Sequence, residues 1–252
     1  MRKQNRLQIA LVIILSLPLF QQLIAQNTDN QLWTTVNIKK KFSHGIALTF
    51  EEKYKLREQF SKTDKLETTI DLSWKPLSFL KGGIAYCRLD YNHPPSPALG
   101  FPSEYWELRH RYLVYLAGSW EAGPFSLSLK EKYQQTYLVG AGSTKVDPIN
   151  VLRSKLDVFY NIKGLPVTPF TNVEYFYSFN EPNGDFPSTT NMLAESRYAV
   201  GLKYGLFKNM DIDLGYLYYA KKSWKKDALG PSIGGFLNSD ANVLTLGFSY
   251  DF

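Results

Sequence analysis

The stretch Asn242-Val-Leu-Thr-Leu-Gly-Phe-Ser-Tyr-Asp-Phe252 decides the fold class of this sequence. Every second position in it is apolar, at Leu244, Leu246, Phe248, Tyr250 and Phe252. A period of two places these side chains on one face of a β-strand. An apolar face that runs to the last residue predicts a strand that closes a barrel and faces lipid.

The same alternation recurs along the chain. Residues 66–75, 106–116, 152–160 and 210–218 each place apolar side chains on one face and charged side chains on the other. Long and short connections alternate between such segments, a rhythm typical of external loops and periplasmic turns. The pattern predicts an all-β fold, an antiparallel transmembrane β-barrel of about 10–12 strands. Nothing divides residues 26–252 into two domains.

Two features of this barrel stay open at the level of sequence. Counting Leu32–Ile38 gives eleven strands, whereas a barrel with both ends in the periplasm needs an even number. Ten or twelve strands are therefore expected. The facing of residues 82–91 is also open, because Ala85 and Cys87 form an apolar outer face only if Arg88 and Asp90 point inward.

The beginning of the sequence predicts export. Arg2, Lys3 and Arg6 precede an almost purely apolar run, Leu7–Phe20. This run is shorter than the about 18–20 residues that a transmembrane anchor needs. We therefore expect residues 1–25 to be a signal peptide that is cleaved after Ala25, leaving residues 26–252 as the barrel domain.

Composition excludes some partners and favours others. The net charge is +6, or +3 without Arg2, Lys3 and Arg6, and the charges are scattered, so nucleic acid is not an expected partner. The 17 Tyr and 16 Phe fit the aromatic girdles of membrane barrels. Cys87 is the only cysteine, which excludes an intramolecular disulfide, and it is expected to be a small packing residue.

Several strand motifs resemble those of a known family. These are Leu32-Trp33-Thr34-Thr35, Leu48–Lys53, Glu107–Tyr112, Glu174-Tyr-Phe176 and Arg197–Tyr204. They are similar to an outer-membrane β-barrel family of unknown function, domain-of-unknown-function family 2490. The resemblance implies a barrel in the outer membrane of a diderm bacterium. It supplies no activity and no catalytic residues.

The terminal strand also resembles the signal by which outer-membrane barrels are recognised during assembly. The barrel assembly machinery is therefore an expected partner, through the strand that ends at Phe252. Outer-membrane lipid and lipopolysaccharide are the other expected partners.

The charged residues opposite the apolar faces are expected to line the lumen. They are Glu67, Asp71, Lys75, Glu107, Arg109, Arg111, Lys130, Lys132, Arg153, Lys155, Asp157, Glu174, Arg197, Lys203, Asp211 and Asp213. Such residues set the selectivity of a channel for ions or solutes. Alternatively, they pair across strands and fill a narrow barrel. The two interpretations are compatible.

A basic cluster lies at the external end of a predicted strand. It consists of Lys221, Lys222, Trp224, Lys225 and Lys226. These residues could bind the phosphates of lipopolysaccharide while Trp224 anchors at the interface. A solvated loop base is the alternative.

The three histidines give little support for catalysis. His44 lies in a predicted turn and His110 lies on an apolar face, so His93 near Ser96 is the least implausible pair. Three scattered histidines have no metal-ligand spacing. The sequence therefore predicts no catalytic residues, no metal site and no cofactor.

The preferred function is a non-enzymatic outer-membrane barrel, either a narrow channel for small solutes or a structural envelope protein. One alternative is a lipid-modifying or lipid-hydrolysing barrel enzyme. Another is a periplasmic binder of small ligands.

Overall fold

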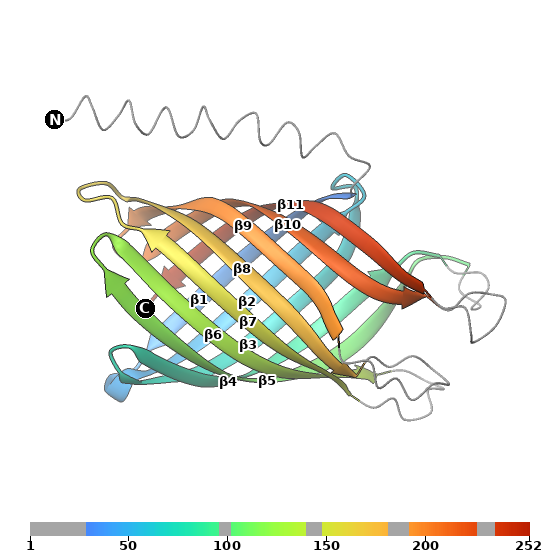
Figure 1. The fold of residues 1–252 in the computed structure, drawn as a ribbon, viewed down its shortest axis with the longest axis horizontal. Helices are drawn as coiled ribbons and strands as arrows, with labels where there is room; N and C mark the ends of the chain where they lie inside the picture. Colours follow the sequence, from blue (N-terminus) through green and yellow to red (C-terminus); the bar gives the residue numbers. More distant parts are fainter. Residues whose placement is uncertain (1–28, 96–101, 140–147, 181–191, 226–234) are drawn as a thin grey trace.

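The computed structural model describes residues 29–95, 102–139, 148–180, 192–225 and 235–252 (Figure 1). Side chains are described in these ranges except at 192 and 222–239. The expected signal peptide, residues 1–25, lies outside the described residues and stays a prediction. Among the described residues, no helix is long and apolar enough to cross a membrane.

The described residues form eleven strands and one turn of 3₁₀ helix, η1. In chain order these elements are β1 (Asp29–Lys41), η1 (Ser43–Gly45), β2 (Ile46–Arg57), β3 (Lys62–Leu77), β4 (Leu80–His93), β5 (Tyr105–Ala122), β6 (Phe125–Val139), β7 (Ile149–Tyr160), β8 (Val167–Asn180), β9 (Met192–Phe207), β10 (Met210–Lys225) and β11 (Gly235–Asp251). They close into one barrel, in which each strand pairs with its chain neighbours and β1 pairs with β11. The predicted all-β barrel is confirmed.

The expectation of ten or twelve strands is wrong, because the barrel has eleven. β1 contains Leu32–Ile38 and pairs with β11 in parallel, from Asp29 opposite Ala241 to Lys39 opposite Asp251. The even-number rule assumes that the first and last strands run in opposite directions. Here they run the same way, and closure by a parallel pair gives an odd count.

The two ends of the barrel differ in the length of their connections. At one end the chain turns through η1 or through residues 78–79, 123–124, 161–166 and 208–209. At the other end the connections 94–104, 140–148, 181–191 and 226–234 are longer, and only 58–61 is short. We call these the short-turn end and the long-loop end. The alternation agrees with the rhythm expected from the sequence.

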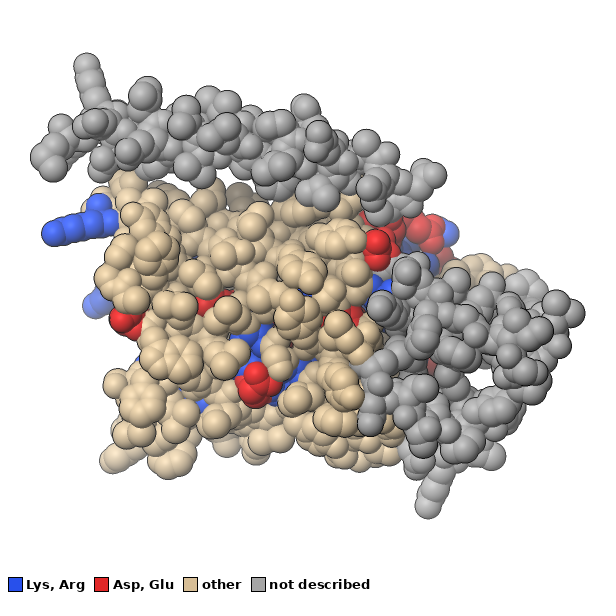
Figure 2. All heavy atoms as spheres, in the orientation of Figure 1, with Lys and Arg blue, Asp and Glu red and all other residues tan. Residues whose placement is uncertain are grey.

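The outer surface of the barrel is apolar. On β3, Ile70, Leu72 and Trp74 are 50%, 47% and 56% exposed, whereas the intervening Ser73 is 2% exposed. On β11, Leu244 is 51% exposed and Val243 is fully buried. Figure 2 shows that uncharged side chains cover most of the described face turned toward the viewer. Strand alternation therefore turns the apolar faces outward and the polar faces inward, as lipid requires.

Large aromatic side chains are exposed near both ends of the barrel. Trp120, Phe207 and Phe252 lie near the short-turn end, and Trp106 and Phe179 lie near the long-loop end. Exposed aromatic side chains near both ends agree with the two interfaces of a bilayer.

The facing of β4 is opposite to the conditional expectation. Cys87 lines the interior and is 3% exposed, whereas the Arg88 side chain is 55% exposed. Arg88 donates to Asp90 through both Nε (2.9 Å) and a terminal nitrogen (3.0 Å). This mutual pairing lets two charged residues occupy the outer face, while small and apolar residues of β4 face the lumen. Cys87 packs there with Leu89 and Leu113.

Candidate functional site: a charged lumen

The barrel encloses a cavity of about 880 Å³. All eleven strands contribute residues to its lining. The lining extends from His93 and Pro94 at the long-loop end to Lys81 and Thr49 near the short-turn end. It contains thirteen Lys or Arg and seven Asp or Glu, an excess of six positive charges. The inner face of the sheet therefore encloses a positively charged space.

The lining residues of β2 and β3 carry no net charge. Four are basic and four are acidic, and we call this set the balanced wall: Glu51, Lys53, Lys55, Arg57, Asp64, Lys65, Glu67 and Asp71. Its centre is Glu67, whose carboxylate lies 2.7 Å from Nζ of Lys55 and 3.6 Å from Nζ of Lys65. The Lys55 side chain is only 3% exposed.

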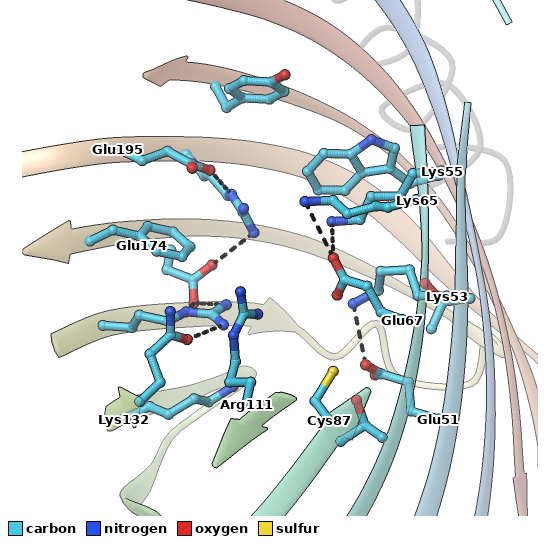
Figure 3. A pocket seen from close by; sticks show the side chains of 18 of the residues that line it. Glu51, Lys53, Lys55, Lys65, Glu67, Cys87, Arg111, Lys132, Glu174 and Glu195 are labelled. Atoms are coloured by element: carbon cyan, nitrogen blue, oxygen red, sulfur yellow. Dashed lines mark hydrogen bonds and ion pairs between the residues drawn. The ribbon is translucent and has the colours of Figure 1, made fainter. Parts of the chain in front are cut away.

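Aromatic rings complete the surroundings of these buried lysines. Nζ of Lys55 lies 3.8 Å from the ring centroid of Trp33, and Nζ of Lys65 lies 4.6 Å from that of Tyr91. A cation held over an aromatic face is stabilised by the ring quadrupole. The balanced wall thus neutralises its three lysines internally (Figure 3).

A second ion-paired group lies on β7, β8 and β9. Glu174 accepts from Arg153 at 2.7 Å and lies 3.6 Å from a terminal nitrogen of Arg197. Arg197 also pairs with Glu195 at 2.5 Å. The centroid of the Phe176 ring lies 4.4 Å from the guanidinium carbon of Arg153 and 4.3 Å from that of Arg197. Figure 3 shows Glu174 and Glu195 across the lumen from Lys55 and Glu67.

The lining residues of β4, β5 and β6, strands that are described throughout, include no acidic side chain. The charged residues there form what we call the basic wall: Lys81, Arg109, Arg111, Lys130 and Lys132. Arg109 pairs with Glu107, which lies outside the cavity lining. Arg111 donates from Nε to Oγ1 of Thr136 at 3.0 Å. The excess positive charge of the lumen is concentrated on this wall.

Two cross-strand pairs on the inner face place cation opposite cation. Lys130 of β6 is opposite Lys155 of β7, and Lys132 is opposite Arg153. Like charges directly opposite each other destabilise a sheet. Lys155 and Arg153 have acidic partners, Asp157 at 2.7 Å and Glu174 at 2.7 Å. Lys130 and Lys132 form no ion pair within the described part of the chain.

Tyr115 connects the basic and balanced walls. Its ring lies over Gly83, where a Cβ would come within 2.5 Å of the ring, and its hydroxyl donates to Asp71 at 2.9 Å. The ring also lies 4.4 Å from Nζ of Lys130 and 5.7 Å from Nζ of Lys81. Because Gly83 has no side chain, the ring lies along the wall and does not project across the lumen.

Most of the charged residues expected in the lumen line the cavity. They are Glu67, Asp71, Arg109, Arg111, Lys130, Lys132, Arg153, Lys155, Asp157, Glu174 and Arg197. Lys75, Glu107, Lys203, Asp211 and Asp213 lie outside its lining. Lys203 and Asp211 pair at 2.9 Å near the short-turn end.

Part of the cavity was missed at the level of sequence. Lys53, Lys55 and Arg57 continue the alternation that starts at Ala47, but Glu52 on the outer face interrupts the apolar pattern. Lys65 and Glu195 were missed as well. Extending the period of two through Glu52 would have found the residues of β2.

The expected lipid-phosphate cluster is only partly described. Lys221 lines the cavity at the long-loop end, and its expected binding of lipid phosphates stays a prediction. Strand alternation turns it inward at the long-loop end of β10. The side chains of Lys222, Trp224 and Lys225, and the whole of Lys226, lie outside the described part.

The histidines lie in three separate environments. His44 is in η1, and Nδ1 of His110 lies 2.6 Å from the Tyr86 hydroxyl. His93 lies at the mouth of the cavity, stacked on Tyr105 with ring centroids 4.9 Å apart. Ser96, its expected partner, lies outside the described residues. Within the described ranges, no three His, Cys, Asp or Glu side chains form a group that could hold a metal ion.

An apolar exterior and a charged interior define a closed β-barrel of the outer-membrane type. The chain belongs to the family described as "Protein of unknown function (DUF2490)", whose model matches residues 30–229. The family resemblance drawn from the strand motifs is thereby confirmed. No curated protein matches the chain.

Several solved structures are similar at low sequence identity. The NanC porin is 11% identical, with 89% of this chain and 99% of that chain covered and a TM-score of 0.47. The beta domain of the Bordetella autotransporter BrkA is 12% identical, with 84% and 86% covered and a TM-score of 0.43. OmpT of Vibrio cholerae, expressed in the outer membrane, is 10% identical, with 81% and 64% covered and a TM-score of 0.41.

Proposed function

We propose that this protein is a non-enzymatic channel for small polar solutes in the outer membrane of a diderm bacterium. One observation carries the proposal: a cavity of about 880 Å³, lined by charged side chains from every strand, lies inside a barrel with an apolar exterior. Charged rings inside such a barrel select ions and small solutes. The wide distribution of the lining residues favours a path through the lumen over a single closed pocket.

A purely structural barrel would use its inner charges to fill and brace the lumen. The balanced wall fits that role, because Lys55, Glu67 and Lys65 satisfy one another. The basic wall does not, because Lys130 and Lys132 add positive charge without any ion pair in the described part of the chain. Cations without a carboxylate partner are better explained by an interaction with the contents of the lumen.

Export and assembly complete the proposal. The expected signal peptide, residues 1–25, would direct the chain across the inner membrane. The barrel assembly machinery would then recognise the strand that ends at Phe252, and lipopolysaccharide would surround the long-loop end. Deletion of Phe252 should reduce the amount of heat-modifiable, folded protein in outer-membrane fractions, whereas Asn209→Ala, in a turn at the same end, should not. Equal amounts of folded protein would contradict the role of Phe252.

The channel is tested by conductance in planar lipid bilayers. The refolded residues 26–252 should show unit current steps, and Arg111→Gln should change their size because Arg111 lines the cavity. Arg88→Gln is the matched control, since Arg88 lies on the outer face. A barrel that is folded by heat modifiability but electrically silent would overturn the proposal.

A further inference from the structure

Arg111, Lys130 and Lys132 of the basic wall form no ion pair within the described part of the chain. Lys130 and Lys132 are neighbours on the inner face of β6, whereas Arg111 lies opposite Thr136, four residues along β6 from Lys132. The Nε of Arg111 donates to Thr136, and within the described residues its two terminal nitrogens have no ion-pair partner. Lys130 contacts the face of the Tyr115 ring, and no ion pair of Lys132 occurs in the described part of the chain. All three side chains line the cavity.

Lys130 and Lys132 lie close to each other and to further cations, so electrostatic repulsion acts on both. Lys130 and Lys132 are two residues apart on the same face of β6, a spacing of about 7 Å. Each lies opposite a further cation on β7, Lys155 and Arg153. The acidic side chains of this region are directed to those β7 cations, as the contacts of Asp157 and Glu174 show. A bound anion would supply the countercharge that the protein itself does not.

We propose that Lys130 and Lys132 form a lumenal binding site for a small dianion that carries carboxylate or phosphate groups. The proposal deepens the proposed function and rests on it for access of the solute to the lumen. Arg111, four residues farther along the wall, adds a guanidinium group whose planar donors attract a carboxylate or phosphate that moves toward the lysines. The lysine ammonium groups act as point charges that attract the anionic groups.

Figure 3 shows how this site differs from its surroundings. Arg111 and Lys132 point into the lumen beside Glu174, while Lys53 and Lys55 lie on the other side against Glu51 and Glu67. An anion that approaches Lys53 or Lys55 has to displace a carboxylate. Within the described residues, no carboxylate forms an ion pair with Lys130 or Lys132, so an anion that reaches them displaces no partner. The position of the site therefore follows from the pairing and does not follow from the total charge alone.

The test is equilibrium binding of succinate and of inorganic phosphate to the detergent-folded barrel, measured by calorimetry at low ionic strength. Wild-type protein should bind at least one of them. Lys132→Gln should weaken binding about tenfold through loss of a charge-assisted contact, and Lys132→Arg should retain it. Lys53→Gln removes the same charge from the balanced wall and is the matched control. It should change the affinity less than about twofold. Heat modifiability verifies the fold of each variant.

The possible outcomes test the anion-binding site separately from the channel. Binding that is lost in Lys132→Gln and kept in Lys53→Gln supports the site, and the preferred probe identifies the anionic group. Equal weakening in both variants, or no binding of either probe by the folded wild-type barrel, overturns the site. A conducting barrel without binding leaves the channel intact. Binding by a barrel that is silent in bilayers keeps the site and overturns the channel.

Discussion

The balanced wall and the basic wall belong to one continuous sheet, yet they use the same kinds of residue differently. On β2 and β3, Glu67 holds Lys55 and Lys65, and Glu51 holds Lys53. On β4, β5 and β6, which are described throughout, the cavity lining contains no acidic residue at all. We infer that charges inside this barrel serve two purposes: paired charges stabilise the structure, and unpaired cations attract solutes.

The largest effect is expected from loss of the central acid of the balanced wall. Glu67→Gln leaves the almost fully buried Lys55 without a countercharge, so the free energy of unfolding should fall by about 3 kcal/mol. Urea unfolding in lipid vesicles measures this loss. The matched control is Glu51→Gln, whose more exposed pair with Lys53 should be worth less than about 1 kcal/mol. If Glu67→Gln were as stable as the wild-type protein, the balanced wall would not stabilise the barrel, and the distinction from the basic wall would be wrong.

An intermediate effect is expected where the two walls meet. In Gly83→Ala the new Cβ would approach the Tyr115 ring to 2.5 Å, displacing the ring and its hydrogen bond to Asp71. Overpacking of this kind costs about 1–3 kcal/mol. In the adjacent Gly82→Ala, the nearest atom to the new Cβ is 3.6 Å away, so the free energy of unfolding should change less. If the two variants have the same free energy of unfolding, the position of the Tyr115 ring does not depend on the absence of a side chain at Gly83.

The smallest effect on stability is expected in the basic wall. Lys130→Gln should leave the free energy of unfolding unchanged or raise it by about 0.2–1 kcal/mol, because it removes the repulsion from the opposite Lys155. The same urea titration measures it. A loss as large as that of Glu67→Gln would show that the cation of Lys130 braces the barrel, and the distinction between the walls would disappear.

Local alternation was enough to predict most strands and most charged residues of the lumen. Residues 210–218 lie in β10 and residues 242–251 lie in β11, because each side-chain direction depends only on the nearest neighbours. The parallel pairing of β1 with β11 could not be predicted this way. It joins strands from opposite ends of the described chain, and alternation carries no information on strand direction.

The ion pairs within the lumen could not be predicted from the sequence either. Glu174 lies directly opposite Arg197 on β9. On β7 the residue directly opposite Glu174 is Lys155, yet Glu174 pairs diagonally with Arg153. Bulges shift the register at Asn150/Val151 and Phe176/Tyr177. Such shifts depend on the whole sheet. Which cations are paired and which are not was therefore visible only in the structure.

The most direct test of the account is the reversal potential of the open channel across a gradient of potassium chloride, measured near 0.1 M, where the Debye length is about 10 Å. The excess of six positive charges in the cavity lining predicts that chloride permeates more readily than potassium. Replacing Arg111, Lys130 and Lys132 together by glutamine should move the reversal potential toward zero. A conducting wild-type channel that prefers potassium, or that does not discriminate between the two ions, would contradict the account.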